Sequence, residues 1–262
     1  MLKSQPCDRP ERVFMSRRSS AFPEKVAQDL MRRILSNEFE GVNVLPSERS
    51  LQDSYSVSRT VVREALKLLA ARGLVSTGSG QGAVVSTNLT APAIDALLLA
   101  FHHSNVRLED LLNTRLLLEP PIAALAAEHA TSLQIRSLHD LVQEMTELGN
   151  VESPVRAATY SYDINARFHT LIAQASQNPV LEILIEMLVG IIWRQQNTID
   201  TQQPTNRHAQ TAEQHGRIVR AIEARQPEAA HMAMNEHLES TRQGLAGTSG
   251  SLRSLIHSLY TD

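Results

Sequence analysis

The chain has 262 residues, of which 42% are hydrophobic, 20% are charged and 4% are aromatic. This length predicts two domains, and this composition is typical of a soluble globular protein with a helical core of Leu, Ile, Val and Ala. The single cysteine, Cys7, excludes an internal disulfide and fits a reducing cytoplasm. The first 20 residues lack the apolar segment of a signal peptide, and the longest apolar stretch, 180–193, is too short to span a bilayer. We therefore expect a cytoplasmic protein without a membrane segment.

The charge is distributed unevenly along the chain, although its net value is only −3. Residues 1–90 hold 13 Lys and Arg against 9 Asp and Glu, whereas residues 91–262 hold 12 against 19. A basic N-terminal part joined to an acidic body is the distribution expected of a nucleic-acid-binding domain attached to a domain with another role.

The basic part begins with a polar segment, residues 1–20, that we interpret as a flexible arm. Apolar residues then recur at four-residue steps, which predicts an amphipathic helix over 23–37. After a break at 41–46, Ser47 is suited to cap a short helix that ends near Tyr55.

The next helix begins at a second N-cap candidate, Ser58, and ends before Gly73, a residue that commonly stops helices. Two short segments, 74–77 and 83–86, flank a glycine-rich turn and predict a β-hairpin. One helix, a helix-turn-helix and a hairpin make a winged helix-turn-helix, which we assign to residues 21–87.

Three basic residues, Arg59, Arg63 and Lys67, lie on one face of the second helix of this pair. On an isolated surface helix, such a stripe is a solvated basic face. In a helix-turn-helix, however, the second helix enters the major groove, where an arginine can donate twice to guanine O6 and N7. Ser58 and Thr60, at the start of the helix, are suited to bind phosphates.

The N-terminal part resembles the GntR family of bacterial regulators over residues 23–86. The resemblance is carried by LPSER at 45–49, SRTVVREAL at 58–66 and GLV at 73–75. It implies that double-stranded operator DNA is contacted by Arg49, Arg59 and Arg63. It also implies that the wing turn, at Gly80 and Gln81, enters the minor groove.

The acidic body is predicted to be helical. We interpret residues 88–93 as a linker, 94–245 as a helical domain and 246–262 as a tail. Helices are expected near 94–103, 108–130, 133–148, 154–176, 179–198, 208–225 and 227–243. Pro120 and Pro121 should kink the second of these helices. The predicted fold class is therefore mainly α, a winged helix-turn-helix followed by an all-helical bundle.

Three histidines, His169, His215 and His237, fall on separate helices of this bundle. Antiparallel helices can bring such side chains to one point, and neutral imidazoles suit Zn²⁺, Ni²⁺ or a similar ion. Spacing alone leaves open that the three histidines are unconnected polar residues.

The body resembles the FCD sensor domain of FadR-like GntR regulators. The resemblance is carried by RLLLE at 115–119, NARFH at 165–169, NP at 178–179, AI at 221–222 and HL at 237–238. It implies a divalent metal ion, such as zinc, nickel or manganese, held by His169, His215 and His237. The family's fourth ligand is an aspartate, whose position is occupied here by Asn165, and an amide oxygen is a neutral, weaker ligand. Asp163 cannot easily replace it, because two residues of helix rotate it about 200° away.

In FCD domains, the arginine that matches Arg115 helps to hold an organic acid against the metal, which implies an effector-binding role here. The alternative is an ion pair with Glu119 on the helix surface. The resemblance to regulators of sugar-acid catabolism suggests a hydroxy acid or an aldonate.

The function implied by both resemblances is that of a homodimeric transcriptional repressor. A small organic acid, bound at the metal-containing domain, would control its affinity for a pseudo-palindromic operator. The alternative is a regulator for which the ion itself is the signal. We do not expect an enzyme, because no general base accompanies the histidines and an enzyme would leave the DNA-binding domain unexplained.

Overall fold

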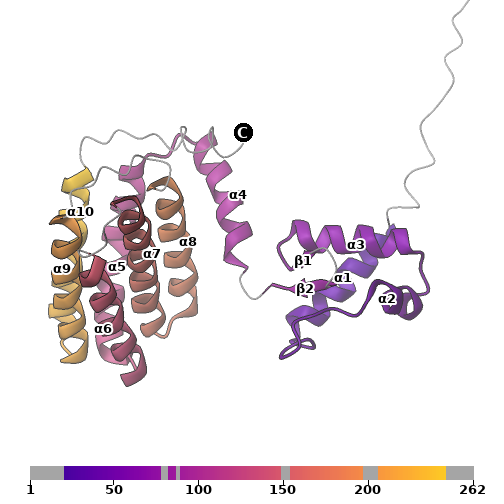
Figure 1. Cartoon of the computed structure of the whole chain (residues 1–262), viewed down its shortest axis with the longest axis horizontal. Coiled ribbons are helices and arrows are strands. Elements are labelled where there is room, and N and C mark those ends of the chain that lie inside the picture. Colours follow the sequence, from indigo (N-terminus) through magenta and orange to yellow (C-terminus); the bar gives the residue numbers. More distant parts are fainter. Residues whose placement is uncertain (1–20, 78–81, 87–88, 149–153, 197–205, 246–262) are drawn as a thin grey trace, which may run out of the picture. The chain divides into compact units, whose positions relative to one another are not determined.

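The computed structural model describes residues 21–77, 82–86, 89–148, 154–196 and 206–245. The chain divides into two compact units, Met1–Pro92 and Ala93–Asp262 (Figure 1). Within the described ranges, ten helices are accompanied by one small antiparallel sheet. The predicted mainly α fold is confirmed.

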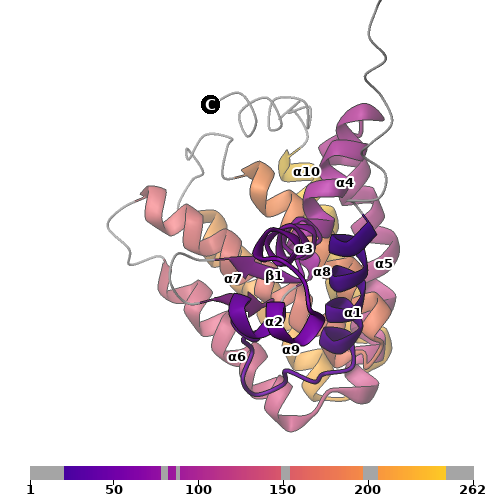
Figure 2. The same cartoon turned by 90° about the vertical axis from the view of Figure 1, so that its right-hand side faces the viewer.

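The first unit contains three helices that share one apolar core: α1 (Ala21–Leu35), α2 (Glu48–Tyr55) and α3 (Arg59–Ala71). Helix α1 lies beside α3 (Figures 1 and 2). Leu30 of α1 and Val62 of α3 are fully buried between them. The apolar periodicity of the sequence therefore identifies the buried faces.

Local capping fixes the helix-turn-helix. The Ser47 hydroxyl oxygen accepts a hydrogen bond from the Ser50 amide at 3.2 Å, and the Ser58 hydroxyl oxygen accepts one from the Val61 amide at 3.4 Å. Between the two helices, Ser56 adopts the left-handed conformation with φ of 52° and ends α2. Both predicted N-caps are confirmed.

The predicted hairpin consists of β1 (Val75–Thr77) and β2 (Ala83–Val85), which pair antiparallel. A further segment joins this sheet, because Val44 forms an antiparallel bridge to Val84. The sequence pattern did not predict this bridge. It ties the wing to the segment that leads into α2.

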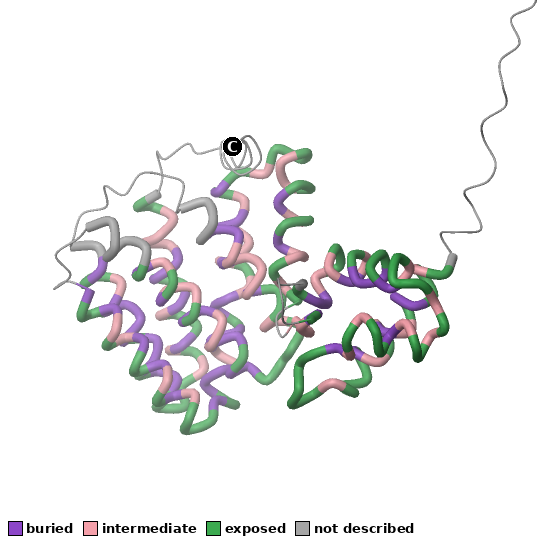
Figure 3. The backbone as a smooth tube through the Cα atoms, turned by 45° about the vertical axis from the view of Figure 1, so that its right-hand side comes forward, coloured by how far each residue is buried: buried purple, intermediate pink, exposed green. Residues whose placement is uncertain are grey.

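The second unit is built from long helices around one central helix, α5. The bounds of the helices are α4 (Thr90–His103), α5 (Leu108–His129), α6 (Ser132–Glu147), α7 (Pro154–Ala175), α8 (Pro179–Gln196), α9 (Asn206–Glu223) and α10 (Pro227–Leu245). Helix α5 lies against α7, α8, α9 and α10. Its side chains Ala123, Ala126 and Ala127 have no exposure, so neighbouring helices can approach closely. Figure 3 shows buried residues recurring along these helices.

Helix α8 contains the longest apolar stretch of the chain. Its residues Ile185 and Ile191 are buried within the second unit, as expected of a core helix. No helix in the part of the chain that the structure describes combines the length and the apolar character that a membrane crossing requires.

Two details of the body differ from the sequence prediction or refine it. Helix α4 begins at Thr90, inside the predicted linker 88–93, because Pro92 lies in the first turn, where a missing N–H breaks no helical hydrogen bond. Helix α5 continues through Pro120 and Pro121 without a break. The predicted arm, 1–20, and the predicted tail, 246–262, lie outside the described residues.

Candidate nucleic-acid interface and candidate metal centre

The exposed face of α3 carries the residues predicted to contact DNA. Arg59, Thr60 and Arg63 are exposed, as are the cap residue Ser58 and Arg49 on α2. The opposite face of α3 is buried in the core of the first unit. Packing therefore fixes which side of the helix faces solvent, and it is the arginine side. The remaining predicted contacts, Gly80 and Gln81, lie outside the described residues.

A glutamate at the start of α2 holds both arginines of α3. The Nε atom of Arg59 donates to Glu48 at 2.8 Å, and the Nε atom of Arg63 donates to the same carboxylate at 3.1 Å. Hydrogen bonds from Arg59, then Arg63, lower the pKa of Glu48, so its carboxylate is charged at neutral pH. Glu48 was not singled out from the sequence, where it appears only within the LPSER motif.

The three predicted histidine ligands meet in the core of the second unit. His169 comes from α7, His215 from α9 and His237 from α10. Each offers a ring nitrogen, and these nitrogens lie within 4.8 Å of one another. All three side chains are buried. The prediction that separate helices bring these histidines together is confirmed.

Hydrogen bonds orient two of the three imidazoles. The Nδ1 atom of His169 lies 2.5 Å from a carboxylate oxygen of Glu119, and the Nδ1 atom of His237 lies 3.0 Å from the amide oxygen of Gln214. Because both partners are acceptors, each Nδ1 carries the proton when the ring is neutral, and each Nε2 carries a lone pair. These two Nε2 atoms are 3.4 Å apart.

The third imidazole has no hydrogen-bond partner. Among the described residues, the only buried side-chain nitrogen or oxygen atoms without a partner are Nδ1 and Nε2 of His215 and Nη2 of Arg115. An orphaned polar atom in a protein core is costly unless something binds it. The unpartnered His215 nitrogens and the two facing lone pairs together form the donor set that suits a transition-metal ion.

Burial keeps the three histidines neutral. Loss of hydration lowers the pKa of His169, although Glu119 opposes the shift. The pKa values of His215 and His237 lie well below the ordinary value, because of burial and then the neighbouring histidines. Neutral imidazole is the form that coordinates metals, so protons do not compete for the site at neutral pH.

Arg115 forms an ion pair with Glu119, as the alternative interpretation required, but the pair is not on the surface. The two side chains are only 3% and 2% exposed. Burial alone would raise the pKa of Glu119, but the charge of Arg115 and the contact with His169 hold it below its ordinary value. Glu119 therefore joins the predicted effector residue Arg115 to the predicted metal ligand His169.

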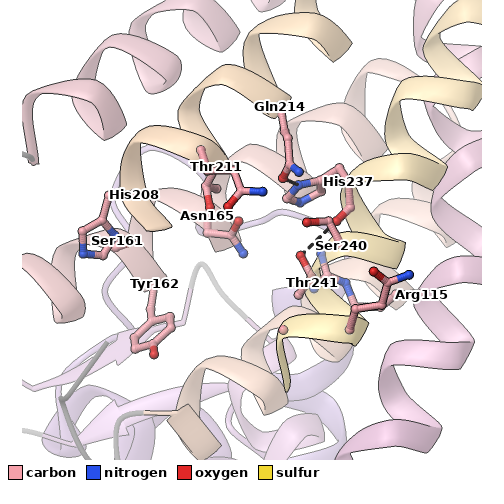
Figure 4. A pocket seen from close by; sticks show the side chains of 13 residues that line it. Arg115, Ser161, Tyr162, Asn165, His208, Thr211, Gln214, His237, Ser240 and Thr241 are labelled. Carbon is pink, nitrogen blue, oxygen red and sulfur yellow. Dashed lines mark hydrogen bonds between the residues drawn. The ribbon is translucent and has the colours of Figure 1, made fainter. Parts of the chain in front are cut away.

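A cavity of about 410 Å³ opens beside Arg115 (Figure 4). It is lined by Arg115, Asn165 and His237, so two of the predicted metal ligands share one cavity with the predicted effector anchor. The rest of its lining is mainly uncharged and polar: Ser161, Tyr162, His208, Gln210, Thr211, Gln214, Ser240, Thr241, Gln243 and Gly244. Asp163 does not line this cavity and pairs instead with Arg167 at 3.6 Å.

Sequence reasoning missed three residues of this site. Glu119 was considered only as a surface partner of Arg115, and Gln214 and His208 were not singled out. His208 is buried and its Nδ1 lies 3.0 Å from the Ser161 hydroxyl oxygen in the cavity wall. The only signals available were that Gln214 directly precedes a predicted ligand and that Glu119 lies one helical turn after Arg115.

Comparison with known proteins agrees with this architecture. The family model "Bacterial regulatory proteins, gntR family" matches residues 23–85, and the model "FCD domain" matches residues 110–240. The HTH-type transcriptional repressor NanR of Citrobacter rodentium (strain ICC168) is 30% identical over 227 residues, covering 83% of this chain and 82% of the relative. NanR of Escherichia coli (strain K12) is also 30% identical over 227 residues, which are 81% of its length. The solved structure of Streptococcus agalactiae GntR has a TM-score of 0.63 and 27% identity, covering 84% of this chain and 99% of that one.

Proposed function

Because the chain belongs to the GntR family of bacterial regulatory proteins and carries an FCD domain, it is a transcriptional regulator, and we propose that it is a repressor controlled by an organic acid. The relatives from two bacteria are named repressors. The observation that carries the proposal is the buried guanidinium of Arg115. Its Nη2 atom has no hydrogen-bond partner, and Arg115 lines the same cavity as His237.

The first step of the proposal is DNA recognition by a homodimer. Helix-turn-helix proteins match their own two-fold symmetry to two half-sites of a pseudo-palindromic operator. The exposed face of α3 enters the major groove, where Arg59 and Arg63 donate to base edges and Ser58 and Thr60 bind phosphates.

Substitution of the two arginines tests this docking. Arg63→Ala should cost roughly 1–3 kcal/mol of specific binding, measured on a duplex that the parent protein selects from a random-sequence pool. Binding by the parent should weaken steeply as salt is raised. Unchanged affinity in both Arg59→Ala and Arg63→Ala would contradict the docking.

The second step is a metal ion in the body. His169, His215 and His237 would hold it, and Asn165 would supply a fourth, neutral donor. Glu119 and Gln214 orient two of the imidazoles so that each Nε2 is available. Such an ion, when bound, can coordinate a carboxylate oxygen and adds positive charge beside the cavity.

The third step is binding of the effector. Nη2 of Arg115 can donate to a carboxylate, and the guanidinium charge strengthens that hydrogen bond. Among the described residues that line the cavity, Arg115 is the only arginine or lysine, whereas hydroxyl and amide groups are abundant. This lining favours an acid with one carboxylate and several hydroxyl groups, such as an aldonate or another hydroxy acid.

Control of DNA binding requires that the acid bind two arrangements of the dimer unequally. A coupling of roughly 1–3 kcal/mol would be typical, and it is reciprocal. The acid that weakens operator binding must therefore itself bind less tightly, by the same factor, when the operator is present. The same titration with metal alone tests the alternative in which the ion is the signal.

The decisive variant is Arg115→Lys, which keeps a positive charge beside Glu119 but lacks the second donor of the guanidinium fork. We expect the metal-loaded variant to bind the operator as the parent does and to lose its response to a panel of aldonates and hydroxy acids. The control is Arg217→Lys, which alters an exposed arginine paired with Glu236. If Arg115→Lys responds as fully as the control, the effector is anchored elsewhere.

The metal is tested separately by elemental analysis after reconstitution with zinc, nickel or manganese. About one ion per chain is expected, and His169→Ala combined with His215→Ala should abolish its binding. The control is His231→Ala, because His231 is exposed on α10. A parent protein that retains no stoichiometric metal would remove the second step.

A further inference from the structure

Glu48 occupies an unusual place, because it puts a negative charge in the middle of the surface expected to face DNA. Its carboxylate accepts hydrogen bonds from Nε of Arg59 and from Nε of Arg63. We propose that Glu48 is a positioning residue that sets the sequence specificity of the protein. The proposal rests on the base contacts proposed above for the two arginines.

Glu48 binds only one side of each guanidinium, the Nε donor, and leaves the two Nη groups available. Glu48 takes the Nε donor of both arginines, and among the described residues no hydrogen bond uses their Nη atoms. The two Nη groups of an arginine are enough for a bidentate contact with guanine. Arg59 and Arg63 are more than half exposed, so without Glu48 each side chain would sample many rotamers. Holding Nε beforehand reduces the entropy lost when the contact forms.

The charge of Glu48 acts in the same direction. Its pKa is lowered, chiefly by the hydrogen bonds from the two arginines, so the carboxylate is ionised at neutral pH. A negative charge beside two arginines weakens their attraction to phosphates, which is the sequence-independent part of binding. Glu48 therefore favours base contacts by orienting the arginines and disfavours non-specific contacts by repulsion.

The same helix offers a matched control. Glu64 lies on α3 and pairs with Lys67 at 2.8 Å, and no hydrogen bond or ion pair of the described residues joins its carboxylate to Arg59 or Arg63. Neutralising Glu64 changes the net charge of the first unit by the same amount as neutralising Glu48. It leaves the hydrogen bonds from Arg59 and Arg63 to Glu48 in place. A comparison of Glu48→Gln with Glu64→Gln therefore separates orientation of the arginines from a general change in charge.

The experiment measures two dissociation constants for each full-length variant. One is for a duplex selected by the parent protein from a random-sequence pool, and the other is for a scrambled duplex of the same composition. Specificity is the dissociation constant for the scrambled duplex divided by that for the selected duplex. For Glu48→Gln we expect this ratio to fall by about tenfold or more, which is the loss expected when the arginines are no longer oriented for a bidentate base contact. For Glu64→Gln both duplexes should bind more tightly, and the ratio should stay within about twofold of the parent.

A second variant separates the length of the side chain at position 48 from its charge. Glu48→Asp keeps the negative charge but is shorter by one methylene, so it should lower the ratio while leaving affinity for the scrambled duplex as in the parent. Thermal unfolding of each variant controls for the loss of an acidic residue at the start of α2. If Glu48→Gln and Glu48→Asp both keep the parent's ratio, the proposal is wrong. Failure of the underlying base contacts is seen independently, in Arg59→Ala and Arg63→Ala.

Discussion

The exposed arginine face of α3 and the buried cluster of the second unit both pair arginine with glutamate, but in opposite surroundings. The side chains of Arg59 and Arg63 are 65% and 57% exposed, and Glu48 is 33% exposed. Arg115 and Glu119 are almost completely buried. Water screens the first group and leaves it weakly bound, whereas the second group lies in a low-dielectric core, where loss of either partner strands a charge.

This difference corresponds to two kinds of task. On the first unit, Glu48 holds only the Nε atoms of two exposed arginines, so their Nη groups stay accessible to a partner from outside the chain. A site that must hold three imidazoles and a guanidinium in fixed positions needs contacts that do not exchange with water. The second unit provides them through Glu119, which contacts both Arg115 and His169.

The largest expected effect tests the contrast between buried and exposed pairs. Glu119→Gln removes the negative charge between Arg115 and His169, and we expect it to lower the free energy of unfolding by about 3–5 kcal/mol. The control within the same unit is Glu144→Gln, which alters an exposed pair with Arg167 at 2.9 Å and should cost less than about 1 kcal/mol. Chemical unfolding followed by circular dichroism measures both, and equal losses would contradict the contrast.

The next effect concerns pH. Because the pKa of folded His215 lies well below the ordinary 6.5, the unfolded chain binds a proton there that the folded chain does not. The contribution of His215 to the stability of the metal-free protein is therefore fully present above about pH 6.5 and is lost as the pH falls below that value. Each such histidine contributes a slope of about 1.4 kcal/mol per pH unit.

Removal of one titrating ring checks this slope. The unfolding free energy of His215→Leu should depend less steeply on pH between 6.5 and 5 than that of the parent, by about the contribution of one histidine. His231→Gln, which alters an exposed ring, should leave the slope unchanged. A parent protein that is equally stable at pH 7 and pH 5 would show that the buried histidines titrate normally.

The smallest effect sharpens the description of the metal site. Asn165→Asp should tighten the binding of a divalent ion by about tenfold, roughly 1.4 kcal/mol, because a carboxylate adds a negative charge to the ligand set. The control is Asp163→Asn, because Asp163 pairs with Arg167 and does not line the cavity. Calorimetric titration with zinc measures both variants. If Asn165→Asp binds zinc no more tightly than the parent, residue 165 is not a ligand.

Local signals explain how much of the fold could be predicted from the sequence. The caps Ser47 and Ser58 act within three residues, and the apolar stripe of α3 repeats along one helix, so both could be predicted. The bridge between Val44 and Val84 joins segments that are distant in sequence, and no local pattern encodes it.

The candidate site was predictable to the same extent. Helical periodicity placed the three histidines on separate helices, and the resemblance to FCD domains then grouped them as one site. Their partners depend on how side chains pack across helices, as in the contact of His169 with Glu119, 50 residues away, and of His208 with Ser161, 47 residues away. Arg115 shows the limit most clearly, since i,i+4 spacing predicted its pairing with Glu119 but not that the pair is buried.

The positions of the cluster residues along the chain also determine when the cluster can assemble. Its contacts join α5 to α7 and α7 to α10, and His169 meets His237 across 68 residues. During synthesis, a chain that has not yet extended to α10 holds at most two of the three histidines. Contacts between such distant residues form late in folding, because the intervening loop must close first. Loading of the proposed metal ion should therefore accompany completion of the bundle, and a chain truncated before α10 should neither retain that ion nor reach the native fold.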